Sequence, residues 1–148
     1  MNEQPPVRVS DVMTTRYQKV DGMVTVAEAI ETLKTNNAIA LIVDKRHDND
    51  EYGIVLIRDI AREVLAKDRA PGRVNVYEIM SKPVVSVDPE MDVKYCIKLF
   101  DNFGLSRAPV VTEGKIIGLV SYTDIVLKSI EMQNGDATVA MDSSTTGD

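Results

Sequence analysis

Three polar side chains that could bind a ligand, those of Ser121, Thr123 and Asp124, lie within four residues of one another. They follow the apolar run 116–120, which has the length of a buried strand, and Ile125 opens a stretch with apolar residues at helical spacing. The first N–H groups of a helix lack partners within the helix and attract anions, and a carboxylate can accept hydrogen bonds from a vicinal diol such as a ribose. We interpret this strand-to-helix junction as a candidate ligand site.

The same junction also has a purely structural interpretation. Ser121 followed three residues later by Asp124 is close to a capping box, in which side chains satisfy the N–H groups at the start of a helix. A helix needs such a cap whether or not it binds a ligand. Gly118, just upstream, admits close approach of a ligand or of another backbone segment. The junction gains weight because the chain contains nearly the same pattern a second time.

An internal repeat with an offset of 67 residues runs through the chain. Residues 9–14 (Val-Ser-Asp-Val-Met-Thr) align with residues 76–81 (Val-Tyr-Glu-Ile-Met-Ser). After small changes in length, residues 52–60 align with residues 117–125, so that the acid at position 59 corresponds to the acid at position 124. Each copy has only about 60 residues, which is small for an independent core, so we expect the copies to share one.

Each copy has the pattern of a β-α-β-β-α unit preceded by a short helical turn. The expected strands cover residues 18–20, 40–43, 52–57, 84–87, 108–111 and 115–120. Two of the expected helices begin after Thr25, which forms a capping box with Glu28, and after the capping residue Asp92. Two more helices are expected at residues 58–66 and 123–132. The predicted fold class is α/β of the α+β type, with two repeats packed as one pseudo-twofold module.

Changes in composition mark the expected domain boundaries. We place the first repeat at residues 7–66 and the second at residues 74–132. The segment 67–73 contains Pro-Gly and several charges and is expected to be an exposed linker. The small, polar tail at residues 133–148 is expected to be disordered.

Composition also argues against several classes of protein. The formal net charge is −6 and the 17 Lys and Arg residues are scattered, so nucleic acid and anionic membranes are not expected as partners. The chain has no apolar run of about 20 residues for a transmembrane helix and no signal-peptide pattern, so we expect a cytoplasmic protein. The single cysteine, Cys96, argues against a disulfide scaffold and is interpreted as a buried small hydrophobe.

The only histidine, His47, lies among acidic residues in the segment 45–51. Such a group could hold a metal ion, but one flexible loop does not preorganise its ligands, and we interpret the segment as a solvated hairpin loop with no metal site. The sequence also offers no Cys-His or Ser-His pairing for nucleophilic catalysis. We therefore expect no enzymatic activity and no catalytic residues.

The repeated pattern resembles the CBS domain, in the tandem form called a CBS pair or Bateman module. The resemblance rests on the starts at residues 11–14 and 78–81, on Leu-Ser-Arg-Ala-Pro-Val-Val at residues 105–111, and on the two Gly-to-Asp junctions, and it covers about residues 7–131. It implies a stand-alone cytoplasmic signal-transduction module rather than an enzyme. Such a module binds an adenine nucleotide (AMP, ADP, ATP or a related adenosyl ligand) in clefts between the copies and passes the signal to a partner protein.

The resemblance also implies roles for individual residues in two clefts. The junction Asp takes the ribose hydroxyls, the nearby Ser or Thr assists it, and Arg107 faces phosphate. Cleft A then combines Ser121, Thr123, Asp124, Arg107, Thr14, Gln18, Ala38 and Ile39. Cleft B combines Arg58, Asp59, Ser81, Val85, Leu105 and Ser106. At the hydroxyl position of the first junction the chain has Leu56, so cleft B lacks a hydrogen bond and is expected to bind less well.

Alternatives stand beside these assignments. Arg107 could bridge surface acids, Asp59 could be only a helix cap, and Leu56 could be core. Tyr17 and Tyr122 could stack on a base or simply pack. For the whole chain, the alternative function is a structural dimerisation scaffold that uses no ligand.

The expected helix that starts after Asp92 carries two apolar stripes. Val93, Cys96, Ile97 and Phe100 form one stripe, which we assign to the core. Tyr95, Leu99 and Phe103 form the other. A second apolar stripe on a small protein is typical of an interface, and the resemblance implies the same, so we expect a homodimer.

Overall fold

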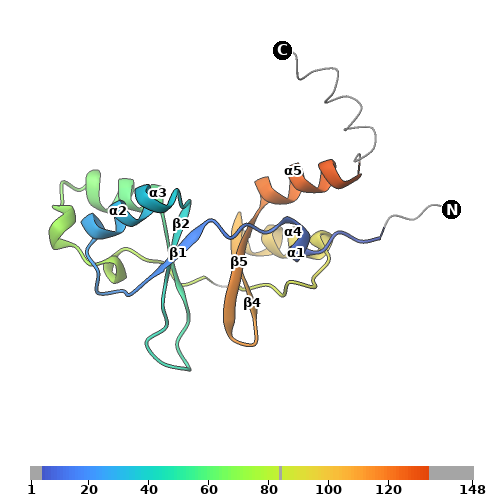
Figure 1. Ribbon diagram of the computed structural model, residues 1–148, viewed down its shortest axis with the longest axis horizontal. Helices are drawn as coiled ribbons and strands as arrows, with labels where there is room; N and C mark the ends of the chain where they lie inside the picture. Colours follow the sequence, from blue (N-terminus) through green and yellow to red (C-terminus); the bar gives the residue numbers. More distant parts are fainter. Residues whose placement is uncertain (1–4, 84, 134–148) are drawn as a thin grey trace, which may run out of the picture. The chain divides into compact units, whose positions relative to one another are not determined.

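Two small β-sheets form the centres of two folded units in the computed structural model (Figure 1), which describes residues 5–83 and 85–133. The first-repeat unit is Thr15–Val85. The second-repeat unit combines Met1–Thr14 with Ser86–Asp148. Each unit mixes helices with a sheet, so the predicted α+β fold with two similar repeats is confirmed.

The sheet of the first-repeat unit has the strand order β1-β2-β3. Its strands are β1 (Tyr17–Val20), β2 (Ala40–Val43) and β3 (Gly53–Leu56). β1 runs parallel to β2, which requires a crossover, and helix α2 (Val26–Asn36) supplies it, while β3 returns antiparallel through the loop 44–52. Every residue of the central strand β2 is buried.

Helix α2 begins at the predicted capping box. The Oγ atom of Thr25 accepts a hydrogen bond from the backbone N of Glu28 at 3.1 Å, and the Glu28 carboxylate accepts one from the backbone N of Thr25 at 3.0 Å. The helix ends where Asn37 takes a left-handed conformation with φ of 50°. Val26, Ala29 and Leu33 of this helix belong to a buried cluster with residues of β2 and β3, and the predicted helix is confirmed.

The second helical segment of this unit starts one residue earlier than expected. It consists of α3 (Ile57–Ile60) followed by a π-helical turn, η1 (Ala61–Leu65). The expected linker contains a short 3-10 turn, η2 (Pro71–Arg73), and a second one, η3 (Val76–Glu78), lies at the start of the second sequence repeat.

The second-repeat unit contains α1 (Val9–Val12), α4 (Val93–Phe103), β4 (Arg107–Thr112), β5 (Lys115–Ser121) and α5 (Tyr122–Gln133). β4 and β5 pair antiparallel, with a bulge between Val110 and Val111. The predicted cap of α4 is confirmed, since the Asp92 carboxylate accepts a hydrogen bond from the backbone N of Lys94 at 2.8 Å. Because α5 extends to Gln133, only residues 134–148 of the tail predicted to be disordered lie outside the described residues.

The strand predicted at residues 84–87 is wrong for the described residues 85–87, and Val84 lies outside the description. Only Val87 pairs with β4: its N–H donates to the carbonyl of Pro109, and Val111 N–H donates to the carbonyl of Val87, each at 2.9 Å. The next bond of a parallel ladder would need an N–H from Pro109, which proline lacks. The first copy has Leu41–Ile42 in the matching part of β2, and there the ladder continues.

The start of each sequence repeat packs with the strands of the other copy. Thr14 exchanges backbone hydrogen bonds of 2.8 and 2.9 Å with Leu119 on β5, and Ser81 exchanges bonds of 2.8 and 3.0 Å with Ile54 on β3. In Figure 1 the blue helix α1 lies beside β5 and α4, although both of these elements are far from α1 in the sequence. The starting segment of each sequence repeat therefore belongs to the folded unit that contains the strands of the other repeat.

A methionine fills the same place in each of these exchanged segments. A Cβ atom on Gly118 would lie 2.6 Å from the sulfur of Met13, and one on Gly53 would lie 2.5 Å from the sulfur of Met80. Gly118 thus admits a neighbouring segment of the protein. The sequence signal was the matched Met and Gly positions of the two copies, but their contact was not predicted.

Candidate functional site

The predicted ligand junction forms where β5 ends and α5 begins. Ser121 is only 8% exposed. Its Oγ donates to Oδ2 of Asp124 at 3.0 Å and accepts from the backbone N of Asp124 at 3.1 Å. The cap that we set against the ligand interpretation is therefore present. It occupies Oδ2 only, and none of residues 5–83 and 85–133 donates a hydrogen bond to Oδ1 of Asp124.

Several other predicted residues surround this junction in the same unit. Arg107 lies directly opposite Ser121 in the β4–β5 ladder, and the carbonyl of Ser106 accepts a hydrogen bond from Tyr122 N at 3.2 Å. Thr14 is hydrogen-bonded to Leu119, two residues before Ser121. The structure thus brings a hydroxyl, a guanidinium and a carboxylate to one end of the β4–β5 sheet.

Arg107 carries a polar atom whose environment is unusual for a surface arginine. Its Nε is buried and has no hydrogen-bond partner among the described residues. Within the same part of the chain no carboxylate forms an ion pair with Arg107, which removes support for the surface-bridging alternative. A buried donor without an acceptor costs about 1–3 kcal/mol, so an anionic ligand oxygen here would be stabilising.

The remaining predicted residues of this unit are peripheral. Thr123 is exposed on the first turn of α5, and Leu105 is half-buried at the end of α4, where its N–H donates to the carbonyl of Phe100 at 2.8 Å. Tyr122 packs edge-on against the buried ring of Phe100, with centroids 5.2 Å apart. For Tyr122 this contact favours the packing alternative over base stacking.

The matching junction of the first-repeat unit, between β3 and α3, is built differently. The backbone N of Leu56 donates to Oδ2 of Asp59 at 2.8 Å, so the carboxylate caps the helix through the backbone. Leu56 is half-buried and offers no hydroxyl, and Arg58 is exposed. The contacts of Asp59 therefore support its interpretation as a helix cap.

The other predicted residues of the first-repeat unit lie around its sheet. Gln18 is on β1 opposite Leu41, Ile39 N–H donates to the carbonyl of Arg16 at 2.9 Å, and Ala38 N–H donates to that of Leu33 at 3.1 Å. Ser81 is exposed and pairs with Ile54, while Val85 is half-buried. Each predicted cleft draws residues from both units, so the clefts themselves stay predictions.

The hairpin loop with the only histidine is more ordered than its sequence indicates. The Asp50 carboxylate accepts hydrogen bonds from the backbone N atoms of Arg46 and Glu51, both at 2.8 Å, and from Lys82 Nζ at 2.9 Å. These bonds, that of Lys82 first, hold the pKa of Asp50 far below its usual range. Among the described residues, no group of three or more His, Cys, Asp or Glu side chains could hold a metal ion.

Two further observations concern reactivity and membranes. Burial raises the pKa of the Cys96 thiol to about 11, so the thiolate needed of a nucleophile is suppressed. Within residues 5–83 and 85–133, no helix combines the length and apolar character needed to span a bilayer.

Comparison with known proteins gives a family match on both copies. The family described as "CBS domain" matches residues 9–66 and 76–131. The CBS domain-containing protein YhcV of Bacillus subtilis is 30% identical over 133 residues, which cover 90% of this chain and 91% of that protein. Another relative, 33% identical over 91 residues, is matched over only 46% of its own length.

Two solved structures show the same fold. The hexameric CBS-CP12 protein from bloom-forming cyanobacteria has a TM-score of 0.77 and 38% identity, covering 86% of this chain and 74% of that chain. The CBS domain protein PAE2072 from Pyrobaculum aerophilum, complexed with AMP, has a TM-score of 0.69 and 19% identity, covering 88% of this chain and 99% of that chain. Together with the repeated β-α-β-β-α pattern, these matches show that the chain belongs to the CBS domain family and carries two CBS domains in tandem.

Proposed function

We propose that this protein is a regulatory module that binds an adenine nucleotide, AMP, ADP or ATP, or a related adenosyl ligand. The observation that carries the proposal is the junction at Ser121 and Asp124, where one carboxylate oxygen has no donor among the described residues and the buried Nε of Arg107 has no acceptor. At fold level, support comes from PAE2072, whose structure was solved with AMP.

In this proposal Asp124 binds the ribose. Its Oδ1 and, by exchange with the Ser121 hydroxyl, its Oδ2 accept hydrogen bonds from the two ribose hydroxyls. Hydrogen bonds to an ionised group contribute about 1.5–3 kcal/mol each. Ser121 keeps the carboxylate in position because it is buried and bonded to both ends of the Asp124 residue.

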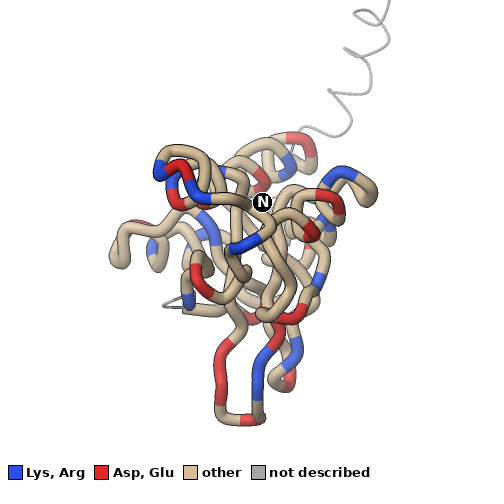
Figure 2. The backbone as a smooth tube through the Cα atoms, turned by 90° about the vertical axis from the view of Figure 1, so that its left-hand side faces the viewer, with Lys and Arg blue, Asp and Glu red and all other residues tan. Residues whose placement is uncertain are grey.

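Arg107 and the start of α5 supply the positive potential for phosphate. The helix has 12 residues, long enough for the partial positive charge of its N-terminus to favour an anion. With a net charge of −6, the protein has no general attraction for phosphate and needs such a local site. Figure 2 shows the interspersed basic and acidic residues along the chain.

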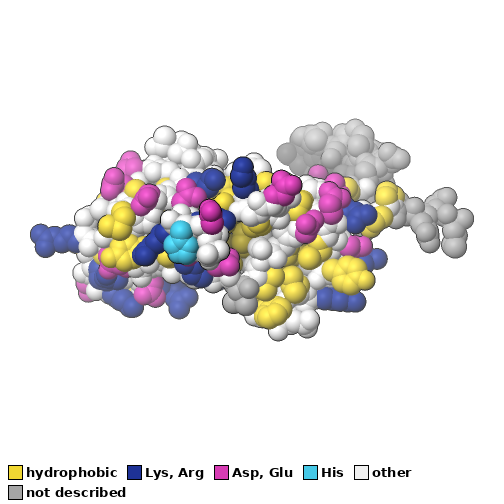
Figure 3. Space-filling view, turned by 90° about the horizontal axis from the view of Figure 1, so that it is seen from below, with side chains coloured by type: hydrophobic (Ala, Val, Ile, Leu, Met, Phe, Trp, Pro, Cys, Tyr) yellow, Lys and Arg dark blue, Asp and Glu magenta, His cyan; other side chains and the backbone are white. Residues whose placement is uncertain are grey.

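We further propose that the module is a homodimer that passes its ligand state to a separate partner protein. Helix α4 exposes Tyr95 (65%) and Phe103 (52%), with Leu99 half-buried between them. Ile97, assigned to the core stripe from the sequence, is 38% exposed and adds to the apolar surface. Hydrophobic side chains at the surface among charged ones are visible in Figure 3.

Sedimentation tests the dimer. We expect a mass of twice 16.3 kDa at micromolar concentration for the wild type. Phe103→Asp should shift the protein to monomer, whereas Met23→Asp, at an exposed methionine of the first-repeat unit, should not. A wild-type monomer contradicts the dimer proposal and leaves nucleotide binding open to its own test.

Calorimetric titration of AMP and of ATP into the purified protein tests nucleotide binding. Saturable binding should also raise the melting temperature, because a ligand that binds only the folded state stabilises it by mass action. The second candidate is a scaffold that uses no ligand, and the Leu56–Asp59 cap of the first-repeat unit favours it for that unit. Absence of binding and of stabilisation by AMP and ATP would exclude both as ligands and favour the scaffold.

A further inference from the structure

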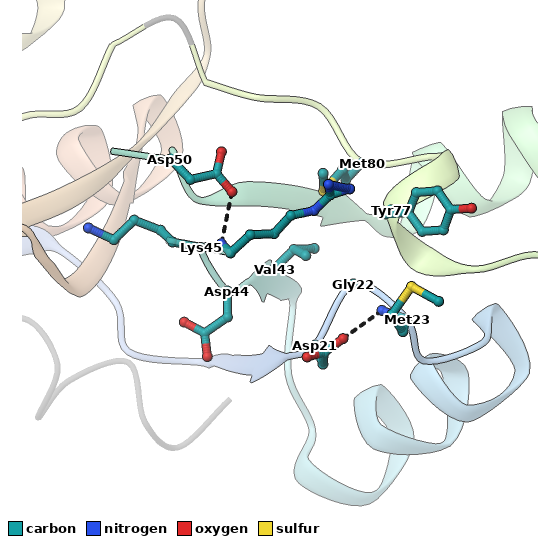
Figure 4. Close-up of a pocket in the computed structure, with 10 residues that line it drawn as sticks. Asp21, Gly22, Met23, Val43, Asp44, Lys45, Asp50, Tyr77 and Met80 are labelled. Atoms are coloured by element: carbon teal, nitrogen blue, oxygen red, sulfur yellow. Dashed lines mark hydrogen bonds between the residues drawn. The ribbon is translucent and has the colours of Figure 1, made fainter. Parts of the chain in front are cut away.

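A cavity lies in the first-repeat unit, and none of its lining residues is among those predicted to bind the nucleotide. Its volume is about 340 Å³. The side chains around it come from the carboxyl ends of β1 and β2, the hairpin loop, and the segment around η3 (Figure 4). The lining residues are Asp21, Gly22, Met23, Val43, Asp44, Lys45, Arg46, Asp50, Tyr77 and Met80. The predicted residues Gln18, Ala38, Ile39 and Asp59 lie toward the other end of this sheet.

Some charges around the cavity are already engaged. Asp50 has both carboxylate oxygens hydrogen-bonded, to Arg46 N, Glu51 N and Lys82 Nζ. The ammonium of Lys45 lies 5.1 Å from the centre of the Tyr52 ring, which is a cation–π contact outside the cavity lining. The side chains of Asp50 and Lys45 are therefore less available to a ligand than charged groups without such partners.

Three charged groups remain available to a ligand. Asp44 is exposed at the end of β2, and no hydrogen bond or ion pair engages its carboxylate within the described part of the chain. Asp21 accepts a hydrogen bond from Met23 N on Oδ1 at 2.8 Å, so its Oδ2 stays available. Arg46 also lines the cavity, and the five N–H groups of its guanidinium have no carboxylate partner among the described residues. The cavity thus offers acceptors for a cation and a fork of donors for an anion.

The rest of the lining is apolar. Val43 is buried at the floor and Met80 is half-buried, while Tyr77 and Met23 present part of their side chains to solvent. Figure 4 places Asp44 on one side of Val43 and Tyr77 on the other, with Asp21 beside Met23, whose backbone N donates to it. A ligand that combines charged groups with an aliphatic group matches this mixed lining.

This cavity depends on features that the second-repeat unit lacks. Gly22 packs so closely that a Cβ atom would lie 3.2 Å from Tyr77 Cβ and 3.3 Å from Val43 Cγ1. In the second copy the corresponding residues are Pro89 and Ser10, which make the matching backbone hydrogen bond of 2.9 Å. The long hairpin loop is replaced there by the two-residue turn Glu113–Gly114, with positive φ at both residues.

We propose that this cavity binds a free α-amino acid with an aliphatic side chain. The carboxylate of the ligand pairs with Arg46, its ammonium pairs with Asp44 and Asp21, and its side chain packs on Met23 and Tyr77. A single guanidinium binds a carboxylate through two parallel hydrogen bonds, which favours arginine for this role. The volume lies at the lower end of the range for small-molecule sites, about 300–1,000 Å³, and suits a ligand of this size.

Three matched probes test the proposal by NMR titration or calorimetry of the full chain: L-leucine, 4-methylpentanoate, which lacks the ammonium, and 3-methylbutylamine, which lacks the carboxylate. We expect saturable binding of L-leucine and at least roughly tenfold weaker binding of either analogue, because each loses one charge-assisted pair. No saturable binding of L-leucine, or an analogue that binds as tightly as L-leucine, overturns the proposal.

Two variants assign the charges. Arg46→Gln should weaken L-leucine at least roughly tenfold and leave 3-methylbutylamine unchanged, and Asp44→Asn should weaken L-leucine likewise and leave 4-methylpentanoate unchanged. Asp48→Asn is the control, since Asp48 is exposed in the same loop and does not line the cavity. Equal binding of L-leucine by Arg46→Gln, Asp44→Asn and the control overturns the assignment. The proposal is independent of nucleotide binding, so Asp124→Ala should bind L-leucine as the wild type does.

Discussion

The two strand-to-helix junctions have the same acid at the same place but differ in what it does. In the first-repeat unit the Asp59 carboxylate accepts the backbone N–H of Leu56. In the second-repeat unit the Asp124 carboxylate accepts the side-chain hydroxyl of Ser121, which in turn accepts the backbone N–H of Asp124. A hydroxyl can donate and accept at once, whereas leucine can do neither with its side chain. The residue three positions before the acid therefore decides which side chain caps the helix start: the acid itself at Asp59, or the serine at Ser121.

The largest expected effect comes from removing the acid of the second junction. Asp124→Ala should weaken AMP or ATP binding at least roughly tenfold, because the ribose loses hydrogen bonds worth about 1.5–3 kcal/mol each. Calorimetry measures the change, with Asp59→Ala as the matched control at the other junction. The wild type should also bind the 2′-deoxy nucleotide more weakly, and Asp124→Ala should discriminate little against it. Equal affinity of wild type and Asp124→Ala for the nucleotide would reduce this junction to a helix cap.

The next largest effect concerns a feature that the two junctions share. Gly118→Ala and Gly53→Ala should each lower the free energy of unfolding by about 1–3 kcal/mol, since the new Cβ meets the sulfur of Met13 or of Met80 in a packed site. Urea denaturation measures both. Gly72→Ala is the control, because its Cβ would meet no atom within 4 Å. Should Gly118→Ala and Gly53→Ala be as stable as Gly72→Ala, the methionines do not require glycine beneath them.

A smaller effect is expected from making the first junction resemble the second. Leu56→Ser restores a hydroxyl three residues before Asp59, and the Asp59 carboxylate then has a side-chain partner in place of a backbone one. If nucleotide also binds at this junction, its affinity should rise by about one hydrogen bond, or ~0.5–1.5 kcal/mol. Calorimetry would register this as a tighter or additional site. Unchanged affinity and stoichiometry in Leu56→Ser would mean that residue 56 does not face a ligand.

The smallest effect is expected on stability at the first junction. Asp59→Ala removes the carboxylate that caps α3 and should lower the free energy of unfolding by about 0.5–1 kcal/mol. Asp59→Asn, which keeps an acceptor oxygen but not the charge, should recover part of the loss. Thermal unfolding of the two variants against the wild type provides the measurement, and a loss well above this range would show that Asp59 does more than cap a helix.

Much of the fold could be predicted because local patterns decide it. The capping box at Thr25, the cap at Asp92 and the buried strand at residues 40–43 are set by neighbouring residues, and each was confirmed. The strand expected at residues 84–87 failed because its partner on β4 contains Pro109, 22 residues beyond its last position. A local pattern carries no information about the donors of a distant partner.

The candidate site likewise has features that local sequence predicts and features that depend on distant residues. The types and spacing of Ser121 and Asp124 were enough to predict a cap with a carboxylate at the helix start, and the structure shows this arrangement. The buried Nε of Arg107 could not be predicted, since it depends on the packing around β4. The order of the hairpin loop was also missed, because the Asp50 bonds include one from Lys82, 32 residues away along the chain.

Because the starting segment of each repeat packs on strands of the other copy, the first such segment cannot complete its packing until the second copy has been synthesised. Leu119, the strand partner of Thr14, is synthesised more than a hundred residues after it. At about 5–20 residues per second, the segment that contains Thr14 waits on the order of ten seconds for its partner strand. Meanwhile the apolar side chains of Val9 and Val12, which are fully buried in the finished protein, have no strand to cover them. A nascent chain paused between the repeats would therefore expose these apolar side chains, in the kind of segment that chaperones bind.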